Sequence, residues 1–200
     1  MERKFIKSTE YLKGYLEGGL DLPGYVLLPH EGAAVDRAVA KQSQAFEEVV
    51  KQKIEVSGGD DWHDGAFRAT DNEAKIVSQQ MSAIAPFIGA VVVEYPDVSE
   101  TRATLGSRLT IVQNGFTYPA DIVGFRAGYP ENIIDEQTGE EVVAISPESP
   151  LARSVIGMRA GEDTIFSNGG RDMNITVATI DQLAVKSYFT DHLPTLEITD

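Results

Sequence analysis

Apolar side chains recur at helical spacing in two neighbouring segments of the first half of the chain. The segment from Ala33 to Val56 holds neither glycine nor proline, and its apolar residues Val35, Val39, Phe46 and Val49 predict one face of a helix. From Asp64 onward the spacing alternates between three and four, at Phe67, Thr70, Ala74, Val77, Met81, Ile84 and Ile88. Such a heptad seam, preceded by the glycine-containing break at Ser57-Gly58-Gly59, predicts two antiparallel helices with facing stripes.

Beyond Val91 the pattern changes to short β-rich runs, separated by the turn signals Asn114-Gly115 and Thr138-Gly139. A short helix follows, with Ser149 as its cap and Pro150 in its first turn, and a last hairpin turns at Asn168-Gly169-Gly170. The predicted fold class is therefore α+β, with an N-terminal antiparallel helical hairpin followed by a small β-sheet domain containing one short helix.

The same patterns divide the chain into four parts. We expect an N-terminal extension over residues 1–30, the helical hairpin with an acidic tip over 31–92, the sheet domain over 103–180 and a tail over 181–200. Within the extension, Ser8 to Glu17 is predicted to form a short helix, for which the sequence indicates no chemistry.

Charge and composition narrow the classes of function. The 200 residues carry 31 acidic and 17 basic side chains, a net charge of −14, which argues against autonomous binding to nucleic acid. The absence of cysteine excludes disulfides and thiolate metal sites. No apolar run has the length of a membrane helix, and the first residues lack the apolar core of a signal peptide, so we expect a cytoplasmic protein without a membrane partner.

Three motifs resemble the Gre family of bacterial transcript-cleavage factors, the GreA/GreB-like proteins. The most specific is Ser149-Pro-Leu-Ala-Arg-Ser-Val-Ile-Gly157, which matches the family signature Ser-Pro-x-Ala-Arg-x-x-Ile-Gly and leads into the terminal hairpin. The run Thr104-Leu-Gly-Ser-Arg-Leu-Thr-Ile-Val is similar to the strand that opens the Gre globular domain, and Asp61 and Asp64 stand where the family has its Asp-x-x-Glu tip. The resemblance covers roughly residues 33–180.

The resemblance implies that the sheet domain is FKBP-like and that the partner is RNA polymerase. The hairpin would enter the polymerase secondary channel, meet the nascent RNA 3′ end only within that complex, and stimulate cleavage of backtracked transcripts. The chain would not be an enzyme, because the cleavage site belongs to the polymerase. Asp61 and Asp64 are the candidate catalytic residues and would help to hold a Mg²⁺ shared with the polymerase, which they do not bind stably alone. Docking is predicted around Pro150, Ala152 and Arg153.

Several alternatives stay open. Asp61 is also a natural helix cap and Asp64 the acidic member of a capping box, and a helix-end salt bridge is the ordinary role for Arg153. Asp64 is shorter than the usual Glu, and Asp60 adds a charge, so a Gre-like inhibitor that blocks the channel is a second hypothesis.

Two further hypotheses belong to other classes of function. A prolyl isomerase would need an aromatic pocket, which Tyr118, Phe125 and Phe166 do not obviously form. A regulator of nucleoside diphosphate kinase is disfavoured by the length of the predicted arm.

Overall fold

The computed structural model describes residues 3–18, 25–57, 64–126, 129–131, 133–135 and 138–183, with the backbone alone for 56, 57 and 64–67. The helices are α1 (Ser8–Glu17), α2 (Pro29–Ser57), α3 (Asp64–Ile84), the 3₁₀ helix η1 (Ala85–Phe87) and α4 (Pro150–Val155). The strands are β1 (Phe5–Ile6), β2 (Val26–Leu27), β3 (Val91–Val93), β4 (Ser107–Gln113), β5 (Phe116–Ile122), β6 (Ile133–Ile134), β7 (Glu141–Ile145), β8 (Asp163–Asn168) and β9 (Arg171–Gln182).

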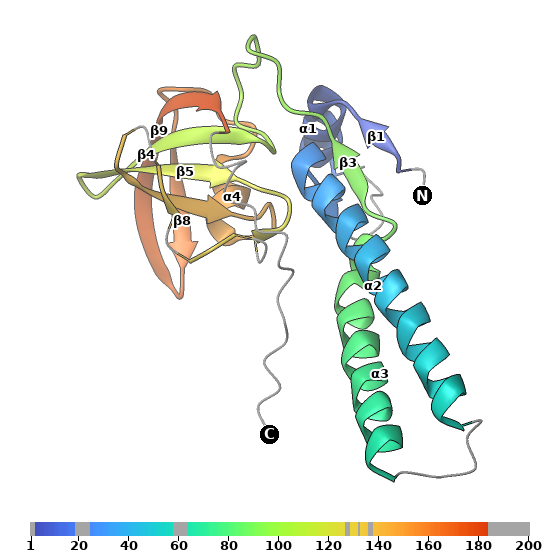
Figure 1. Cartoon of the computed structure of the whole chain (residues 1–200). Coiled ribbons are helices and arrows are strands. Elements are labelled where there is room, and N and C mark those ends of the chain that lie inside the picture. Colours follow the sequence, from blue (N-terminus) through green and yellow to red (C-terminus); the bar gives the residue numbers. More distant parts are fainter. Residues whose placement is uncertain are drawn as a thin grey trace.

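Helices α2 and α3 run antiparallel as one arm that projects away from the rest of the molecule (Figure 1). The predicted seam is the buried one, since Val49 on α2 and Val77 and Ile84 on α3 are each less than 10% exposed. The helical hairpin is therefore confirmed. Phe46 was expected in the α2 stripe, but it is 46% exposed. The preceding residue, Ala45, is the half-buried one, four residues before the buried Val49. Phe46 is rotated about 100° around the helix from Ala45, so its side chain lies beside the seam and not in it.

The N-terminal extension folds onto the base of the arm. Strands β1 and β2 pair in parallel with β3 on either side of it, in the order β1-β3-β2, and α1 connects them (Figure 1). β3 is buried along its whole length, as expected for a short apolar strand at the centre of a sheet. Residues before the hairpin are thus built into the fold through hydrogen bonds to the strand that follows it.

A six-stranded sheet in the order β6-β7-β5-β4-β9-β8 forms the second half of the molecule. All its pairs are antiparallel except β5 with β7. On β4 the even alternation puts Leu109 and Ile111 in the core and Arg108 and Thr110 on the opposite face. The Asn114-Gly115 turn joins β4 to β5, and β8 and β9 form the predicted last hairpin. The α+β fold class is confirmed.

The two sheets share one apolar core. Leu12 of α1, Leu28 at the start of the arm and Val93 of β3 belong to the same buried cluster as Leu109 and Val177 of the large sheet. A smaller cluster at the base of the arm contains Leu27, Val35, Ile84, Phe87, Ala90 and Val92. The base of the hairpin is consequently fixed to the sheet domain by packing, whereas the outer part of the arm is stabilised by its own seam.

Candidate partner-binding surface and the junction beside it

The predicted metal site falls at the break between α2 and α3 in the sequence. Asp61 is outside the described residues, and Asp64 is described only as the first residue of α3, without its side chain. Their shared role with Mg²⁺ stays a prediction. Within the described part of the chain no group of three or more His, Cys, Asp or Glu side chains is arranged to hold a metal ion. No described helix combines the length and apolar character needed to span a membrane.

The predicted docking surface is centred on α4, a helix of six residues. The Ser149 side chain caps it by accepting a hydrogen bond from the Ala152 backbone N–H at 3.2 Å, and Pro150 occupies the first turn, as the sequence predicts. Arg153 and Pro150 are exposed, but Ala152 is fully buried. Only two of the three predicted docking residues therefore present side chains at the surface, and Ala152 fixes the helix to the core.

Immediately after α4, Gly157 is held in one place by two hydrogen bonds. Its N–H donates to the Ala103 carbonyl at 2.8 Å, and its carbonyl accepts from Arg102 Nη1 at 3.1 Å. Its φ of +91° favours glycine, and a Cβ here would lie 2.7 Å from Leu16 Cδ2 of α1. The end of the family-like motif is therefore a close contact between α4 and the N-terminal extension.

Glu31, a fully buried charged residue, lies in the first turn of α2 at the junction between the arm and the large sheet. Its Oε2 accepts from the Leu28 N–H at 2.7 Å. Its Oε1 reaches across to the segment after β5 and accepts from the N–H groups of Gly124 at 3.1 Å and Phe125 at 3.2 Å. Gly124 is required here, since a Cβ would lie 2.5 Å from the Glu31 carboxylate. Burial raises the pKa of Glu31 to about 7, and these hydrogen bonds partly oppose the rise.

A chain of hydrogen bonds runs from Glu31 to the Tyr129 hydroxyl, then to His30 and on to the Tyr95 hydroxyl. The Tyr129 hydroxyl donates to Glu31 Oε1 at 3.0 Å, and the same hydroxyl lies 2.5 Å from His30 Nε2. His30 Nδ1 lies 2.7 Å from the Tyr95 hydroxyl. Because the single hydroxyl proton of Tyr129 is used in its hydrogen bond to Glu31, His30 Nε2 is the donor in the bond to Tyr129. In a neutral His30, Nδ1 then accepts from the Tyr95 hydroxyl. Burial, with the Glu31 charge nearby, raises the pKa of Tyr129 well above its usual range.

This junction was not predicted from the sequence. His30 and Glu31 lie next to each other at the start of α2, but Gly124 and Tyr129 are more than 90 residues further on. The one local indication in the sequence is that an acidic residue in the first turn of a helix is stabilised by the helix dipole. Many exposed acids have the same position, so it does not single out Glu31. Nothing in the spacing indicates that this acid is buried.

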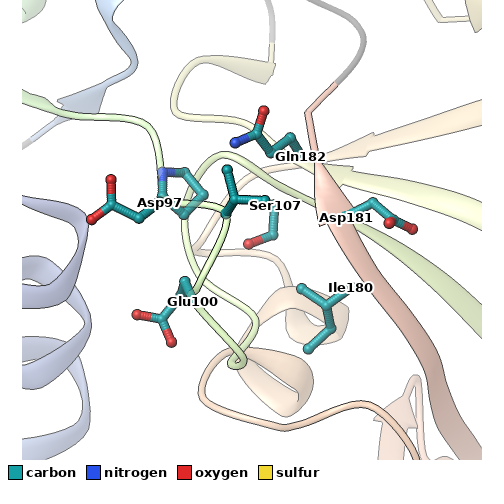
Figure 2. A pocket seen from close by; sticks show the side chains of 8 residues that line it. Asp97, Glu100, Ser107, Ile180, Asp181 and Gln182 are labelled. Carbon is teal, nitrogen blue, oxygen red and sulfur yellow. The ribbon is translucent and has the colours of Figure 1, made fainter.

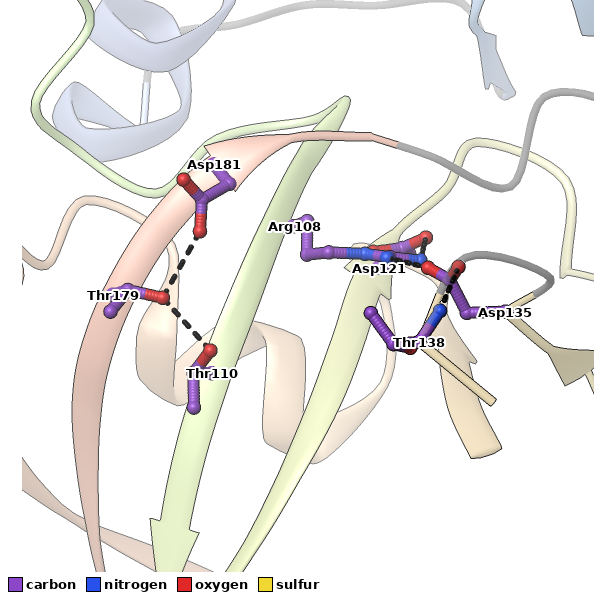
Figure 3. Close-up of polar contacts among 7 residues, drawn as sticks. All are labelled: Arg108, Thr110, Asp121, Asp135, Thr138, Thr179 and Asp181. Carbon is purple, nitrogen blue, oxygen red and sulfur yellow. Dashed lines mark hydrogen bonds and ion pairs between the residues drawn. The ribbon is translucent and has the colours of Figure 1, made fainter. Parts of the chain in front are cut away.

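A second ionic group lies on the face of the large sheet opposite the core (Figure 3). Arg108 of β4 binds Asp121 of β5 bidentately at 2.8 and 3.0 Å and also pairs with Asp135. Asp135 in turn accepts from the Thr138 N–H at 3.3 Å. Arg108 and its two acids tie the loop around Asp135 to the sheet, so we assign these residues a structural role.

An acidic recess of about 290 Å³ lies between the linker after β3 and the end of β9 (Figure 2). Its carboxylates come from Asp97, Glu100 and Asp181. Glu100 accepts from the Arg102 N–H at 3.1 Å, and Asp181 accepts from the Thr179 hydroxyl at 3.1 Å. These internal contacts account for two of the three acids, and we assign the recess no ligand.

The three aromatic residues considered for a prolyl-isomerase pocket lie apart. Phe166 is buried in the main core, Phe125 packs on Phe87 at a centroid distance of 4.2 Å, and Tyr118 donates to Gln113 at 2.8 Å. The structure therefore gives no aromatic-lined proline site built from these residues.

Comparison with solved structures finds several chains with a similar arrangement. The chain is similar to GreA factor homolog 1 (Gfh1) of Thermus thermophilus, with 18% identity, a TM-score of 0.34, and coverage of 78% of this chain and 97% of that one. Gfh1 of Thermus aquaticus gives 18% identity, a TM-score of 0.32, and coverage of 80% and 99%. The prokaryotic transcription elongation factor GreA/GreB from Nitrosomonas europaea gives 18% identity and a TM-score of 0.29, over 51% of this chain and 78% of that one.

No protein-family model and no curated protein matches the chain.

Proposed function

We propose that this chain is a transcription elongation factor that binds RNA polymerase, inserts the tip of the α2–α3 arm into the secondary channel and stimulates cleavage of backtracked transcripts. The observation that carries the proposal is the arm itself. α2 has 29 residues, which at 1.5 Å per residue is about 43 Å, and beyond its packed base the arm projects away from both sheets (Figure 1). A projecting arm with acids at its end suits the delivery of carboxylates into a deep, narrow site.

The chemistry proposed for the tip is assistance to metal-dependent hydrolysis. Carboxylate oxygens are the ligands that Mg²⁺ prefers, and one or two protein carboxylates are usual in sites where other ligands complete the shell. Asp61 and Asp64 would supply such ligands to an ion that the polymerase also holds. The nucleic acid would be met only inside that complex, consistent with a net charge of −14.

The second part of the proposal is docking through the sheet domain, on the surface around Arg153. Support comes from the motif that ends at Gly157 and from the exposure of Arg153 and Pro150 on a helix that Ser149 caps and Ala152 anchors in the core. Arginine is enriched at protein interfaces because its guanidinium makes several directed hydrogen bonds.

A transcript-cleavage assay on stalled, backtracked polymerase tests the function directly. We expect faster shortening of the RNA 3′ end in the presence of the protein, and no RNA cleavage by the protein alone. A protein that binds polymerase but slows both elongation and cleavage would support the channel-blocking inhibitor instead, for which the adjacent Asp60 and the shorter Asp64 are the motivating observations. A protein that does not bind polymerase would overturn both hypotheses.

A further inference from the structure

The N-terminal extension, to which the sequence assigned no chemistry, lies against the end of α4. Leu16 of α1 contacts the backbone at Gly157, where a Cβ would approach Leu16 Cδ2 to 2.7 Å. Two hydrogen bonds hold the Gly157 backbone in place, as described above, so Leu16 packs on a segment of fixed position. α1 thus packs directly on the turn that follows α4.

The inner face of α1 is anchored in the main core. Tyr11 and Leu12 are 2% and 5% exposed, and Tyr15 packs on the same cluster with its ring centroid 6.0 Å from that of Tyr11. Burial raises the pKa of the Tyr15 hydroxyl, and the Arg153 guanidinium opposes that rise, so the two groups are within electrostatic reach of each other. The shared core and the contact between Leu16 and Gly157 therefore place α1 beside the segment that follows α4.

The side chains around this contact are accessible to solvent. Leu16 is 53% exposed although it touches Gly157, Tyr15 is half-buried, and Arg153 is exposed. A tyrosine, a leucine and an arginine on one surface combine large apolar area with directed hydrogen bonds, and tyrosine and arginine are among the residue types enriched where most binding energy is concentrated. We call Tyr15, Leu16 and Arg153 the α1–α4 patch.

We infer that the surface by which this chain binds RNA polymerase is composite, with Tyr15 and Leu16 of the N-terminal extension joining Arg153 of α4. The inference rests on the proposed function. A stable protein interface covers about 800 Å² on each partner, roughly a disc 30 Å across. A partner centred on Arg153 therefore covers Tyr15 and Leu16 as well, because α1 packs directly on the segment that ends α4.

Affinity for core RNA polymerase, measured with the full chain and a set of single variants, tests the inference. We expect Leu16→Ser to weaken binding about tenfold, corresponding to about 1.4 kcal/mol. Leu16→Met should bind like the parent, because it keeps the apolar contact, and Glu10→Ser, an exposed change on the same helix away from the patch, should have no effect. Arg153→Glu should weaken binding at least as much as Leu16→Ser, with little change in the thermal midpoint.

The variants separate failure of the inference from failure of the proposed function. Weakening by Arg153→Glu together with parent-like binding by Leu16→Ser would overturn the composite surface and leave the docking proposal intact. Tighter binding by Leu16→Ser would also overturn it, since α1 would then mask the site. Unchanged binding by Arg153→Glu would remove α4 from the interface altogether. If Leu16→Ser lowers the thermal midpoint, Leu16→Gln, which keeps the side-chain volume, replaces it in the same comparison.

Discussion

The arm and the junction around Glu31 at its base are held together differently: the arm mainly by apolar side chains, and the junction by a buried charged side chain and its hydrogen bonds. In the arm, a single seam that includes Val49 and Val77 holds two helices together, and large apolar residues such as Phe46 and Ile54 remain exposed beside it. At the junction, Glu31 is fully buried and hydrogen-bonded both to Leu28, three residues before it, and to Gly124, 93 residues further along the chain. A two-helix arm has one layer of contacts and tolerates change along its length. The junction combines packing with several hydrogen bonds to one buried carboxylate. We therefore expect the loss of a single hydrogen-bonding group there to lower the stability of the fold.

Substitutions at the tip of the arm should abolish stimulated cleavage without unfolding the protein. Replacing Asp61 and Asp64 together by Asn removes both carboxylates but keeps the volume and most of the capping ability of each residue. We expect stimulated cleavage to fall at least 100-fold, with binding to polymerase retained and stability changed by less than about 1 kcal/mol. The measurement is the cleavage rate of a backtracked complex, with Asp71→Asn as control. Asp71 is also an arm acid, but it pairs with Lys53 and Lys75 away from the tip.

Persistence of cleavage in the double variant would contradict the metal role of the tip. Raising the Mg²⁺ concentration sharpens the result. A variant that has only lost affinity for the ion should recover part of its rate, whereas one that no longer positions the attacking water should not.

The junction should show the largest loss of stability. Glu31→Ala leaves the N–H groups of Leu28, Gly124 and Phe125 without their acceptor in a dry site, and we expect at least about 3 kcal/mol of destabilisation. Urea unfolding measures it. A loss below about 1 kcal/mol would mean that water or another group replaces the carboxylate, and the junction would then be no more sensitive than the arm.

Glu31 should also make stability depend on pH. Its pKa is raised from 4.5 to about 7, so the folded state keeps this proton over a range in which the unfolded state has released it. The stabilising contribution is complete below about pH 4.5 and is lost as the pH rises through 7, by up to about 3 kcal/mol. Subtracting the profile of Glu31→Gln, which cannot titrate, isolates this residue from the histidines. A difference profile that is flat between pH 5 and 8 would show that the buried carboxyl titrates in its ordinary range.

These two regions also show what the sequence can reveal. The arm was predictable because its signal is local, with Thr70, Val77 and Ile84 repeating at heptad spacing within one segment. The turns and the α4 cap were predictable for the same reason. The junction was not, since Glu31 gains its role from Gly124 and Tyr129, which lie far along the chain. The contact between Leu16 and Gly157 is equally non-local, and Ala152 was taken for a surface residue because a motif does not say which face of its helix is buried.

Core substitutions should show a difference between the arm and the sheet domain as well. Leu109 of β4 is fully buried among several elements, and Leu109→Ala should cost about 3 kcal/mol from lost burial and the cavity left behind. Val49→Ala in the arm should cost about 1.5 kcal/mol, because fewer methyl groups are removed and the two helices can close over the gap. Thermal unfolding followed by circular dichroism measures both. Equal costs would indicate that the arm packs as tightly as the sheet domain.

The smallest effect expected concerns the helix that positions the docking surface. α4 is only six residues long, too short to be stable without its surroundings, and the Ser149 hydroxyl is the one side chain that caps it among the described residues. Ser149→Ala should lower the free energy of unfolding by about 1 kcal/mol, since the Ala152 N–H loses its acceptor. Ser149→Asp should retain the cap and restore the loss. If the cap also orients Arg153, the alanine variant should bind polymerase a few-fold more weakly and the aspartate variant normally. Weaker binding by both variants would instead place Ser149 itself in the interface, because the two changes share only the loss of the serine hydroxyl.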